Sequence, residues 1–136
     1  MVQIDSTYEG QLRCAATHGP SATSLQTDAP KDNMGRGESF SPTDLVATAL
    51  GTCMLTTMGI VAQRNNIRMD GATASVTKEM ISQPSRRIGR LGVTITVPGT
   101  FSDDDRKRLE GAALACPVHK SLHPDVQIPV TFNWPG

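Results

Sequence analysis

A long apolar stretch in the first half of the chain has the pattern of a helix. It opens with Ser41, Pro42 and Asp44, which fit an N-cap, a first helical position and a capping-box acid. Behind this start, residues recur at helical spacing on one side: Val46, Leu50, Cys53, Met54, Thr57, Met58 and Val61. The pattern predicts a helix over 42–65.

A second helix is predicted further along the chain. Ser102 is its candidate N-cap, and three aspartates follow in its first turn, where carboxylates favour the helix dipole. Its apolar face is formed by Leu109, Ala112, Ala113 and Cys116. Because proline lacks an amide proton, Pro117 must break or kink this helix. Pro117 also suits the first position of a new short helix, which would make Cys116 its cap.

The remaining segments indicate strands and loops. Apolar and polar residues alternate over 72–80 and 91–97, with a turn at 83–85, so these segments are expected to form a hairpin. Alternation returns over 126–134, where Pro129 favours an edge position. Residues 1–30 show weak alternation, which predicts two or three short strands. The Pro- and Gly-containing stretch 28–40 is expected to be a loop.

Length and charge narrow the class of protein. At 136 residues we expect one domain, residues 1–136, of the mixed α/β class. Thirteen basic and thirteen acidic residues balance, so nucleic-acid binding is not indicated. The N-terminus lacks the features of a signal peptide, and a cytoplasmic location is expected. The uncharged segment 45–63 could span a membrane, but its Thr, Gly and Gln content favours a helix buried on nearly all sides of a soluble protein.

Cysteine is the residue type that most changes this picture. Cys14, Cys53 and Cys116 are too few and too widely spaced for a disulfide scaffold. Cys53 and Cys116 lie on the apolar faces of the two predicted helices, so their thiols could meet in one core. Either cysteine alone is more often a packing residue. However, Cys116 lies at a helix restart, where backbone amides and the dipole stabilise a thiolate. Cys14 has no motif around it and is interpreted as structural.

Other polar clusters carry weaker signals. Cys116, His119 and His123 share one helix face and could bind zinc, with Cys53 as a fourth ligand. Pro117 disturbs that geometry, and no carboxylate is placed to orient the imidazoles, so no metal is expected. An arginine cluster at the hairpin, formed by Arg86, Arg87 and Arg90, is interpreted as a solvated surface.

Two segments resemble a known family. Residues 41–54, Ser-Pro-Thr-Asp-Leu-Val-Ala-Thr-Ala-Leu-Gly-Thr-Cys-Met, look like a signature of the OsmC/Ohr family, the osmotically inducible and organic hydroperoxide resistance proteins. Residues 115–122, Ala-Cys-Pro-Val-His-Lys-Ser-Leu, resemble its second signature. The resemblance covers almost the whole chain and is weakest over residues 1–35.

The resemblance implies a fold and a chemistry. The expected fold is an intertwined α/β homodimer, in which central helices are wrapped by antiparallel sheets from both chains. Cys53 would be the peroxidatic nucleophile that forms a sulfenic acid, and Cys116 would condense with it to a disulfide. An external dithiol would reduce the disulfide, and no bound cofactor is implied.

One position departs from the family pattern. Peroxidases of the family usually carry Glu ten residues before the first cysteine, where this chain has Thr43 with Asp44 beside it. The family also uses an arginine near the thiolate. Arg36, with Glu38 nearby, is the first candidate for that role and Arg13 the second. Without the resemblance, both arginines are interpreted as solvated charges in loops.

Three functional hypotheses follow. The first is a peroxidase for organic hydroperoxides, with Met54, Met58 and Phe40 as candidates to line the substrate crevice. The second, motivated by Thr43, is a non-catalytic dimer of the same fold that binds a small hydrophobic ligand or a partner. The third is a metal-binding protein that uses Cys116 and the nearby histidines.

Overall fold

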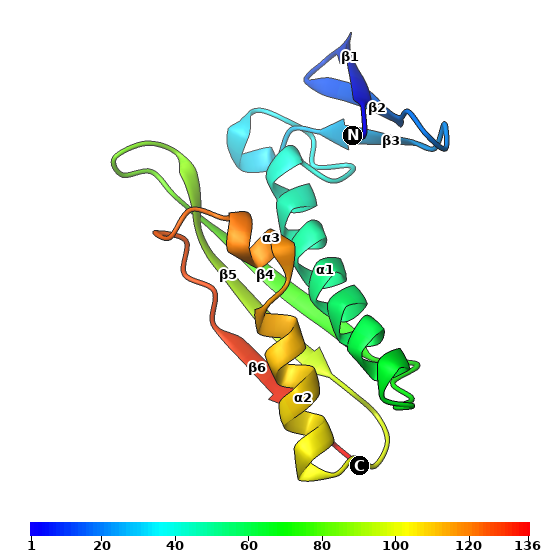
Figure 1. Cartoon of the computed structure of the whole chain (residues 1–136). Helices are drawn as coiled ribbons and strands as arrows, with labels where there is room; N and C mark the ends of the chain where they lie inside the picture. The colour runs from blue at the N-terminus through cyan, green and yellow to red at the C-terminus, as the bar shows by residue number, and fades with distance from the viewer. The chain divides into compact units, whose positions relative to one another are not determined.

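The computed structural model describes all 136 residues and contains two compact units (Figure 1). The first unit is Met1–Val46 and the second is Ala47–Gly136, so the boundary falls inside the first long helix. Each unit has its own three-stranded sheet.

The sheet of the first unit is antiparallel, in the order β1-β2-β3. Its strands are β1 (Ile4–Gly10), β2 (Arg13–His18) and β3 (Ser24–Asp28). A short 3-10 helix, η1 (Lys31–Asn33), follows. The expectation of two or three short N-terminal strands is therefore confirmed.

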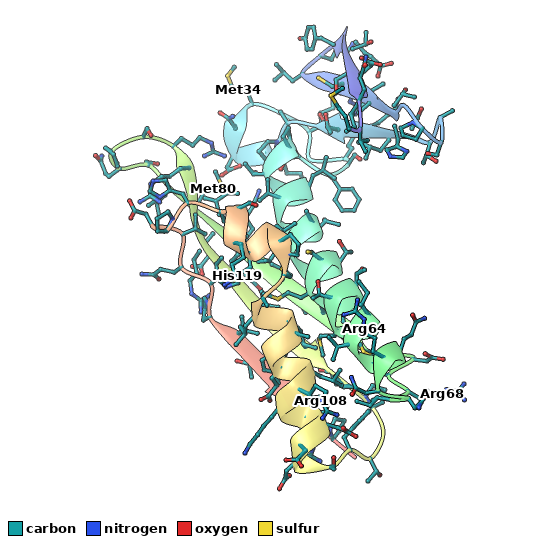
Figure 2. The ribbon with its side chains drawn as sticks, in the orientation of Figure 1. Met34, Arg64, Arg68, Met80, Arg108 and His119 are labelled. Carbon is teal, nitrogen blue, oxygen red and sulfur yellow. The ribbon has the colours of Figure 1, made fainter.

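The first unit leaves many apolar side chains uncovered. Its exposed large apolar residues are Met1, Val2, Ile4, Tyr8, Leu12, Leu25, Met34 and Phe40. Met34 is 90% exposed, and Figure 2 labels it beside the short helix. A sheet with this surface lacks a core of its own, because its apolar residues stay in contact with water.

Backbone hydrogen bonds fasten the loop that follows β3. The amide of Asp28 donates to the carbonyl of Phe40 at 3.0 Å, and the amide of Ala29 donates to Leu12 at 3.1 Å. The amide of Gly37 donates to the carbonyl of Ala29 at 3.1 Å, so the loop folds back on its first residues. The predicted loop over 28–40 is thus an ordered connection between β3 and the first helix.

The second unit holds most of the regular structure. Its elements are α1 (Pro42–Arg64, which starts in the first unit), β4 (Thr73–Ile81), β5 (Arg87–Thr96), α2 (Asp103–Leu114), α3 (Pro117–Ser121) and β6 (Val130–Asn133). The sheet order is β4-β5-β6, with β4 antiparallel and β6 parallel to β5. Figure 1 shows α1 and α2 on the same face of this sheet.

The core of the second unit lies between the sheet and these helices. It is formed by Leu50, Met54 and Met58 of α1, Leu91, Val93, Ile95 and Val97 of the β5 segment, and Leu109 and Ala113 of α2. Alternate residues of β5 are buried, as expected for a strand with one covered face.

The bounds of helix α1 agree with the prediction to within one residue. The set of residues that it buries differs from the prediction. Leu50, Met54 and Met58 are buried, whereas Val46, Cys53, Thr57 and Val61 are only half-buried. The other buried residues of the helix are Ala47, Gly51 and Ala62. Their small size allows the helix backbone to approach the sheet. Within the single chain the helix is therefore not buried on nearly all sides.

Helix α1 has charged residues only near its ends, Asp44 and Arg64, and it also meets a simple criterion for a membrane span. By length and composition it could cross a bilayer, although a third of its most apolar window is buried within the chain. The central helix of a soluble protein passes the same test, so this result alone does not place the helix in a membrane.

The predictions for the second half of the chain hold, with one change of length. The β4–β5 hairpin, the start of α2 at Ser102 and the helix break before Pro117 are confirmed. The final strand is shorter than expected, because only 130–133 pair continuously with β5 and Gln127 forms an isolated bridge. Strand β6 lies at an edge of its sheet, as Pro129 predicts.

Candidate functional site

The capping box at the start of α1 fixes the frame in which Cys53 lies. The amide of Asp44 donates to Oγ of Ser41 at 3.1 Å, and the amide of Ser41 donates to Oδ2 of Asp44 at 2.9 Å. This reciprocal pair satisfies amides that the helix itself cannot. Thr43, where the family usually has glutamate, lies in the same turn, with Oγ1 3.2 Å from Oγ of Ser41.

Cys53 lies midway along α1 and is half-buried. Hydroxyls near it bond back to helix carbonyls: Oγ1 of Thr57 donates to Cys53 at 2.8 Å, and Oγ1 of Thr52 donates to Thr48 at 2.8 Å. The hydroxyls of Thr52 and Thr57 are therefore satisfied within the helix, and they need no ligand to explain them.

Cys116 lies between α2 and α3 and is 0% exposed. It is the N-cap of α3, and its Sγ accepts the backbone N–H of His119 at 3.3 Å. Pro117 follows at the first position of that helix, as the sequence predicts. Figure 2 labels His119 on this short helix.

The structure brings the side chains of Cys53 and Cys116 together. Burial raises the pKa of Cys116 most, and a hydrogen bond and charge interaction with Cys53 raise it further. The backbone N–H groups of His119 and Val118 act in the opposite direction. Two thiols placed in this way, one half-buried on α1 and one fully buried between α2 and α3, can form a disulfide with each other. Both cysteines are free thiols in this structure.

The charged candidates from the sequence lie in the first unit and pair differently from the expectation. Glu38 does not face Arg36. Its Oε2 instead accepts a hydrogen bond from Nη2 of Arg13 at 2.7 Å. Arg36 is exposed. The second candidate, Arg13, is therefore the arginine that Glu38 holds.

Asp28 completes this cluster, and the sequence analysis missed it. Its carboxylate is 1% exposed, lies 3.6 Å from Nη2 of Arg13, and accepts the amide of Glu38 at 3.0 Å. The Glu38 hydrogen bond, followed by the charge of Asp28, raises the pKa of the Arg13 guanidinium. No motif marks Asp28, but an acid at the end of a strand, just before an ordered loop, is a signal that could have found it.

The histidines do not assemble into a metal site with the cysteines. No group of three His, Cys, Asp or Glu side chains in the structure is arranged to hold a metal ion. His123 is exposed, and its Nδ1 accepts the amide of Asp125 at 3.0 Å.

The other candidate residues lie in ordinary surroundings. Arg90 forms an ion pair with Glu79 at 2.9 Å, and Nη1 of Arg87 donates to the carbonyl of Ile88 at 3.4 Å. Cys14 is half-buried in β2, opposite Tyr8 and Thr27 on the neighbouring strands.

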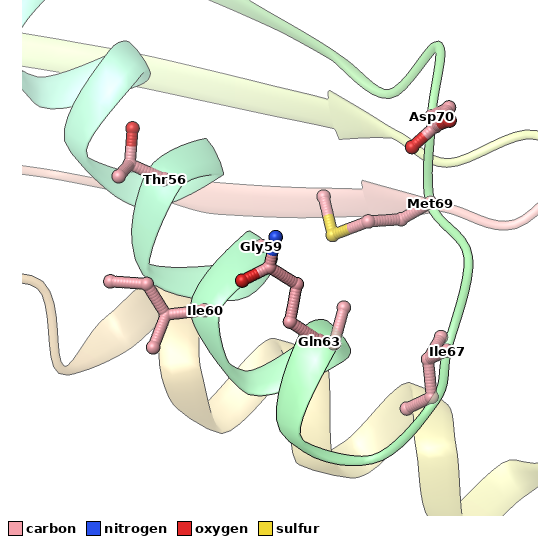
Figure 3. A pocket seen from close by; sticks show the side chains of 8 residues that line it. Thr56, Gly59, Ile60, Gln63, Ile67, Met69 and Asp70 are labelled. Carbon is pink, nitrogen blue, oxygen red and sulfur yellow. The ribbon is translucent and has the colours of Figure 1, made fainter.

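A pocket that sequence reasoning missed lies at the C-terminal end of α1 (Figure 3). Its volume is about 340 Å³, and it is lined by Thr56, Gly59, Ile60, Ala62, Gln63, Ile67, Met69 and Asp70. Figure 3 shows Gln63 of the helix on the side of Met69 and Ile67, whereas the side chain of Ile60 extends away from them. The lining combines apolar side chains with the polar ones of Thr56, Gln63 and Asp70.

Comparison with known proteins places this arrangement in context. A family model described as OsmC-like protein matches residues 35–131, and no curated protein matches the chain. A solved structure from Psychrobacter arcticus 273-4, named as a candidate osmotic stress induced and detoxification response protein, is 45% identical with a TM-score of 0.92. The alignment covers 98% of this chain and 96% of that one.

More distant structures share the fold. An OsmC-like protein from Mycoplasma pneumoniae is 16% identical, with a TM-score of 0.82. An organic hydroperoxide resistance protein OsmC from Legionella pneumophila is 16% identical, with a TM-score of 0.75. Each alignment covers 98% of this chain and 96% of the other. The matched family model spans both cysteines and most of the sequence, so this chain belongs to the OsmC-like family.

Proposed function

We propose that this protein is a thiol-dependent peroxidase that reduces organic hydroperoxides. The observation that carries the proposal is the contact between a half-buried thiol, Cys53, and a fully buried thiol, Cys116. The fold shared with proteins named for organic hydroperoxide resistance supports it.

The reaction proceeds in two steps at these sulfurs. The Cys53 thiolate attacks one oxygen of the hydroperoxide, the O–O bond breaks, and the alcohol leaves with a proton. Cys53 is then a sulfenic acid. The Cys116 sulfur attacks the Cys53 sulfur, water leaves, and a disulfide forms. An external dithiol restores both thiols, so the protein needs no bound cofactor.

The different exposure of the two cysteines supports the roles proposed for them. A hydroperoxide must reach the first sulfur, and Cys53 is the more accessible of the pair. Cys116 needs to reach only Cys53, so its complete burial is compatible with the resolving role. We propose that the working unit is a homodimer, because the first unit leaves its apolar side chains uncovered.

The test measures hydroperoxide consumption and maps disulfides. Wild type should consume cumene hydroperoxide with dithiothreitol as reductant and form a Cys53–Cys116 disulfide. Cys53→Ser should lose this activity. Cys116→Ser should lose the disulfide and become over-oxidised at Cys53. Cys14→Ser is the matched control and should retain the wild-type rate. Full activity in Cys53→Ser would overturn the proposal.

We also propose that an arginine of the first unit assists the thiolate, and we favour Arg13 over Arg36. Arg13 is fixed by two carboxylates, whereas Arg36 is exposed. A fixed cation can stabilise the negative charge of a thiolate, so Arg13→Gln should slow peroxide reduction at least about tenfold at neutral pH if Arg13 has this role. Arg36→Gln is the matched control. A larger loss in Arg36→Gln would reverse the assignment.

The pocket at the end of α1 favours one alternative. If the protein is a non-catalytic binder, its ligand is a small apolar molecule that fits among Ile60, Ile67 and Met69. In that case peroxide leaves all three thiols intact, and Ile60→Asp abolishes binding of an apolar fluorescent probe.

A further inference from the structure

The pocket at the end of α1 is separate from the pair of sulfurs. Its volume is about 340 Å³, and it lies between the last turns of α1 and the segment 67–70 that follows (Figure 3). Neither Cys53 nor Cys116 lines it. A volume above about 300 Å³ is in the range of small-molecule sites. A ligand held in this pocket therefore does not depend on the chemistry of the thiols.

A missing side chain on α1 leaves part of this pocket open. Gly59 is half-buried, and a Cβ atom placed on it would have no heavy atom within 4 Å. Gly51 of the same helix differs, because a Cβ atom there would lie 3.0 Å from Cγ2 of Val76. Glycine in the middle of a helix costs stability relative to alanine. Packing within the chain accounts for Gly51 but not for Gly59, whose effect is to keep the pocket open.

The polar side chains of the lining are hydrogen-bond acceptors. They belong to Thr56, Gln63 and Asp70. Thr52 and Thr57 of the same helix bond back to helix carbonyls, whereas the hydroxyl of Thr56 has no such bond. No lysine or arginine is among the lining residues. This set of acceptors favours a ligand that donates hydrogen bonds.

The only charged group in the lining is the carboxylate of Asp70. Its partner Arg68 lies 3.4 Å away, and 88% of the Arg68 side chain is exposed. An ion pair as exposed as this one is weak, so a ligand cation can replace Arg68 beside Asp70. The C-terminal end of a helix also carries a partial negative charge, and Gln63 of the lining lies in the last turn of α1. Both effects favour a cationic ligand over an anionic one.

The side of the pocket opposite the helix is apolar. It is formed by Ile67 and Met69, and Figure 3 shows the thioether of Met69 extending toward the helix beside Gln63. A thioether is flexible and makes favourable contacts with aromatic rings. An aromatic ring between Met69 and the open position at Gly59 would therefore be held on both sides.

We propose that the pocket at the end of α1 binds a small aryl-alkyl amine, with its ring between Gly59 and Met69 and its ammonium group beside Asp70. An alkyl amine is protonated at neutral pH, and it donates hydrogen bonds that the carboxylate and the neutral acceptors of the lining can take. This site goes beyond the proposed function, since it uses neither cysteine.

Titration with 2-phenylethylamine tests the site. Nuclear magnetic resonance spectra of protein with ¹³C-methyl methionine report on Met69, and Met80 near the end of β4 is the internal control. We expect a saturable shift of the Met69 signal and none at Met80. Phenylacetate, an anion of similar shape, should bind more weakly than the amine. No saturable shift at Met69, or tighter binding of phenylacetate, would overturn the proposal.

Two substitutions separate shape from charge. Gly59→Leu fills the pocket, and leucine is a good helix former, so the fold should persist while binding of the amine is lost. Gly111→Leu, at an exposed and unobstructed glycine of α2, is the matched control and should bind as wild type does. Asp70→Asn should weaken binding of the amine about threefold and leave binding of the neutral 2-phenylethanol unchanged, as expected for an exposed ion pair. Asp125→Asn, at another exposed acid, is its control.

The variants also show how the proposal fails. Binding of wild-type strength in Gly59→Leu would overturn the position of the ring, and an equal effect of Asp70→Asn on the amine and the alcohol would overturn the role of charge. A second copy of the chain is the alternative occupant. In that case the wild type does not bind the amine and Gly59→Leu changes the mass measured by light scattering, which overturns the proposal. Cys53→Ser should bind the amine as wild type does, so the result is independent of peroxidase activity.

Discussion

Asp28 shows how a single buried charge can organise a loop. Its carboxylate accepts the amide of Glu38 and lies beside Arg13, and its backbone amide reaches Phe40. The other oxygen, Oδ1, is buried without a hydrogen-bond partner. A carboxylate in this position is stabilising only while its cation stays in place.

Replacing Asp28 should loosen the loop between β3 and α1. Asp28→Ala leaves the Glu38 amide and part of Arg13 without an acceptor, which costs about 1–3 kcal/mol of the free energy of unfolding. Urea unfolding measures this loss, and hydrogen exchange at the Glu38 amide should become faster. Asp5→Ala, at an exposed acid in β1, is the matched control. If the two variants lose the same stability, Asp28 does not hold the loop.

Cys116 makes the stability of the reduced protein depend on pH. Its pKa is raised in the folded state, so above the ordinary thiol pKa, about 8.5, the unfolded chain loses a proton that the folded chain keeps. The contribution of Cys116 to the free energy of unfolding is fully present below that pH, and it is lost as the pH rises through the pKa of Cys116 in the folded protein.

Comparison with Cys116→Ala isolates this effect. The difference in free energy of unfolding between reduced wild type and Cys116→Ala should be constant from about pH 6 to pH 8 and should shrink above that range. Urea unfolding at a series of pH values measures it. A difference that grows with pH would mean that the folded protein favours the Cys116 thiolate.

At the scale of elements, α1 is a helix whose two sides have different partners. Gly51 faces β4, where a Cβ atom would lie 3.0 Å from Cγ2 of Val76 and 3.6 Å from Cβ of Ala74. Gly59, two turns later, has no atom within 4 Å of that position. The absence of a side chain at Gly51 therefore allows α1 to pack closely on β4. Gly59 has no neighbour that would require a glycine.

Alanine substitutions should separate these two glycines. Gly59→Ala should raise the free energy of unfolding by about 0.5–1 kcal/mol, because alanine is the better helix former and nothing obstructs it. Gly51→Ala should gain less or lose stability, since Val76 must move. Gly111→Ala in α2, also unobstructed, is the control. Thermal unfolding measures all three, and an equal gain at Gly51 would contradict the packing of α1 on β4.

Element boundaries also show where sequence patterns succeed and fail. Helix α1 and helix α2 begin at their predicted caps, because Ser41 and Ser102 bond to amides three residues later. The first hairpin has no such signal. Its turn places Gln11 and Leu12 at φ of 55° and 63°, values that usually require Gly or Asn, so local propensity does not reveal it.

At the scale of the whole molecule, uncovered apolar surface is the main unexplained feature. Most of the exposed large apolar residues belong to the first unit, and Ile60 of the apolar helix α1 is also 46% exposed. Surface of this extent usually marks an interface. A second copy of the chain, which the family resemblance implies, would cover it.

We therefore expect a dimer in solution. Light scattering after gel filtration should give twice the chain mass of 14.5 kDa. Ile4→Asp together with Leu25→Asp, two exposed apolar positions of the first unit, should shift the protein toward monomer and lower its stability, because burial of apolar side chains at the interface is lost. Thr7→Asp, at an exposed polar position of β1, is the control. A wild-type monomer would contradict the expectation.

The sequence by itself determined the features that depend on neighbouring residues: the caps and bounds of α1 and α2, the break at Pro117, the β4–β5 hairpin and the two cysteine motifs. These follow from short-range hydrogen bonds and side-chain periodicity. Tertiary structure decided what depends on distant residues meeting. It paired Glu38 with Arg13 rather than Arg36, buried Asp28 beside them, and set β6 parallel to β5. It also brought Cys53 against Cys116 with unequal exposure, because sheet packing rather than helix spacing chooses the buried side of each helix.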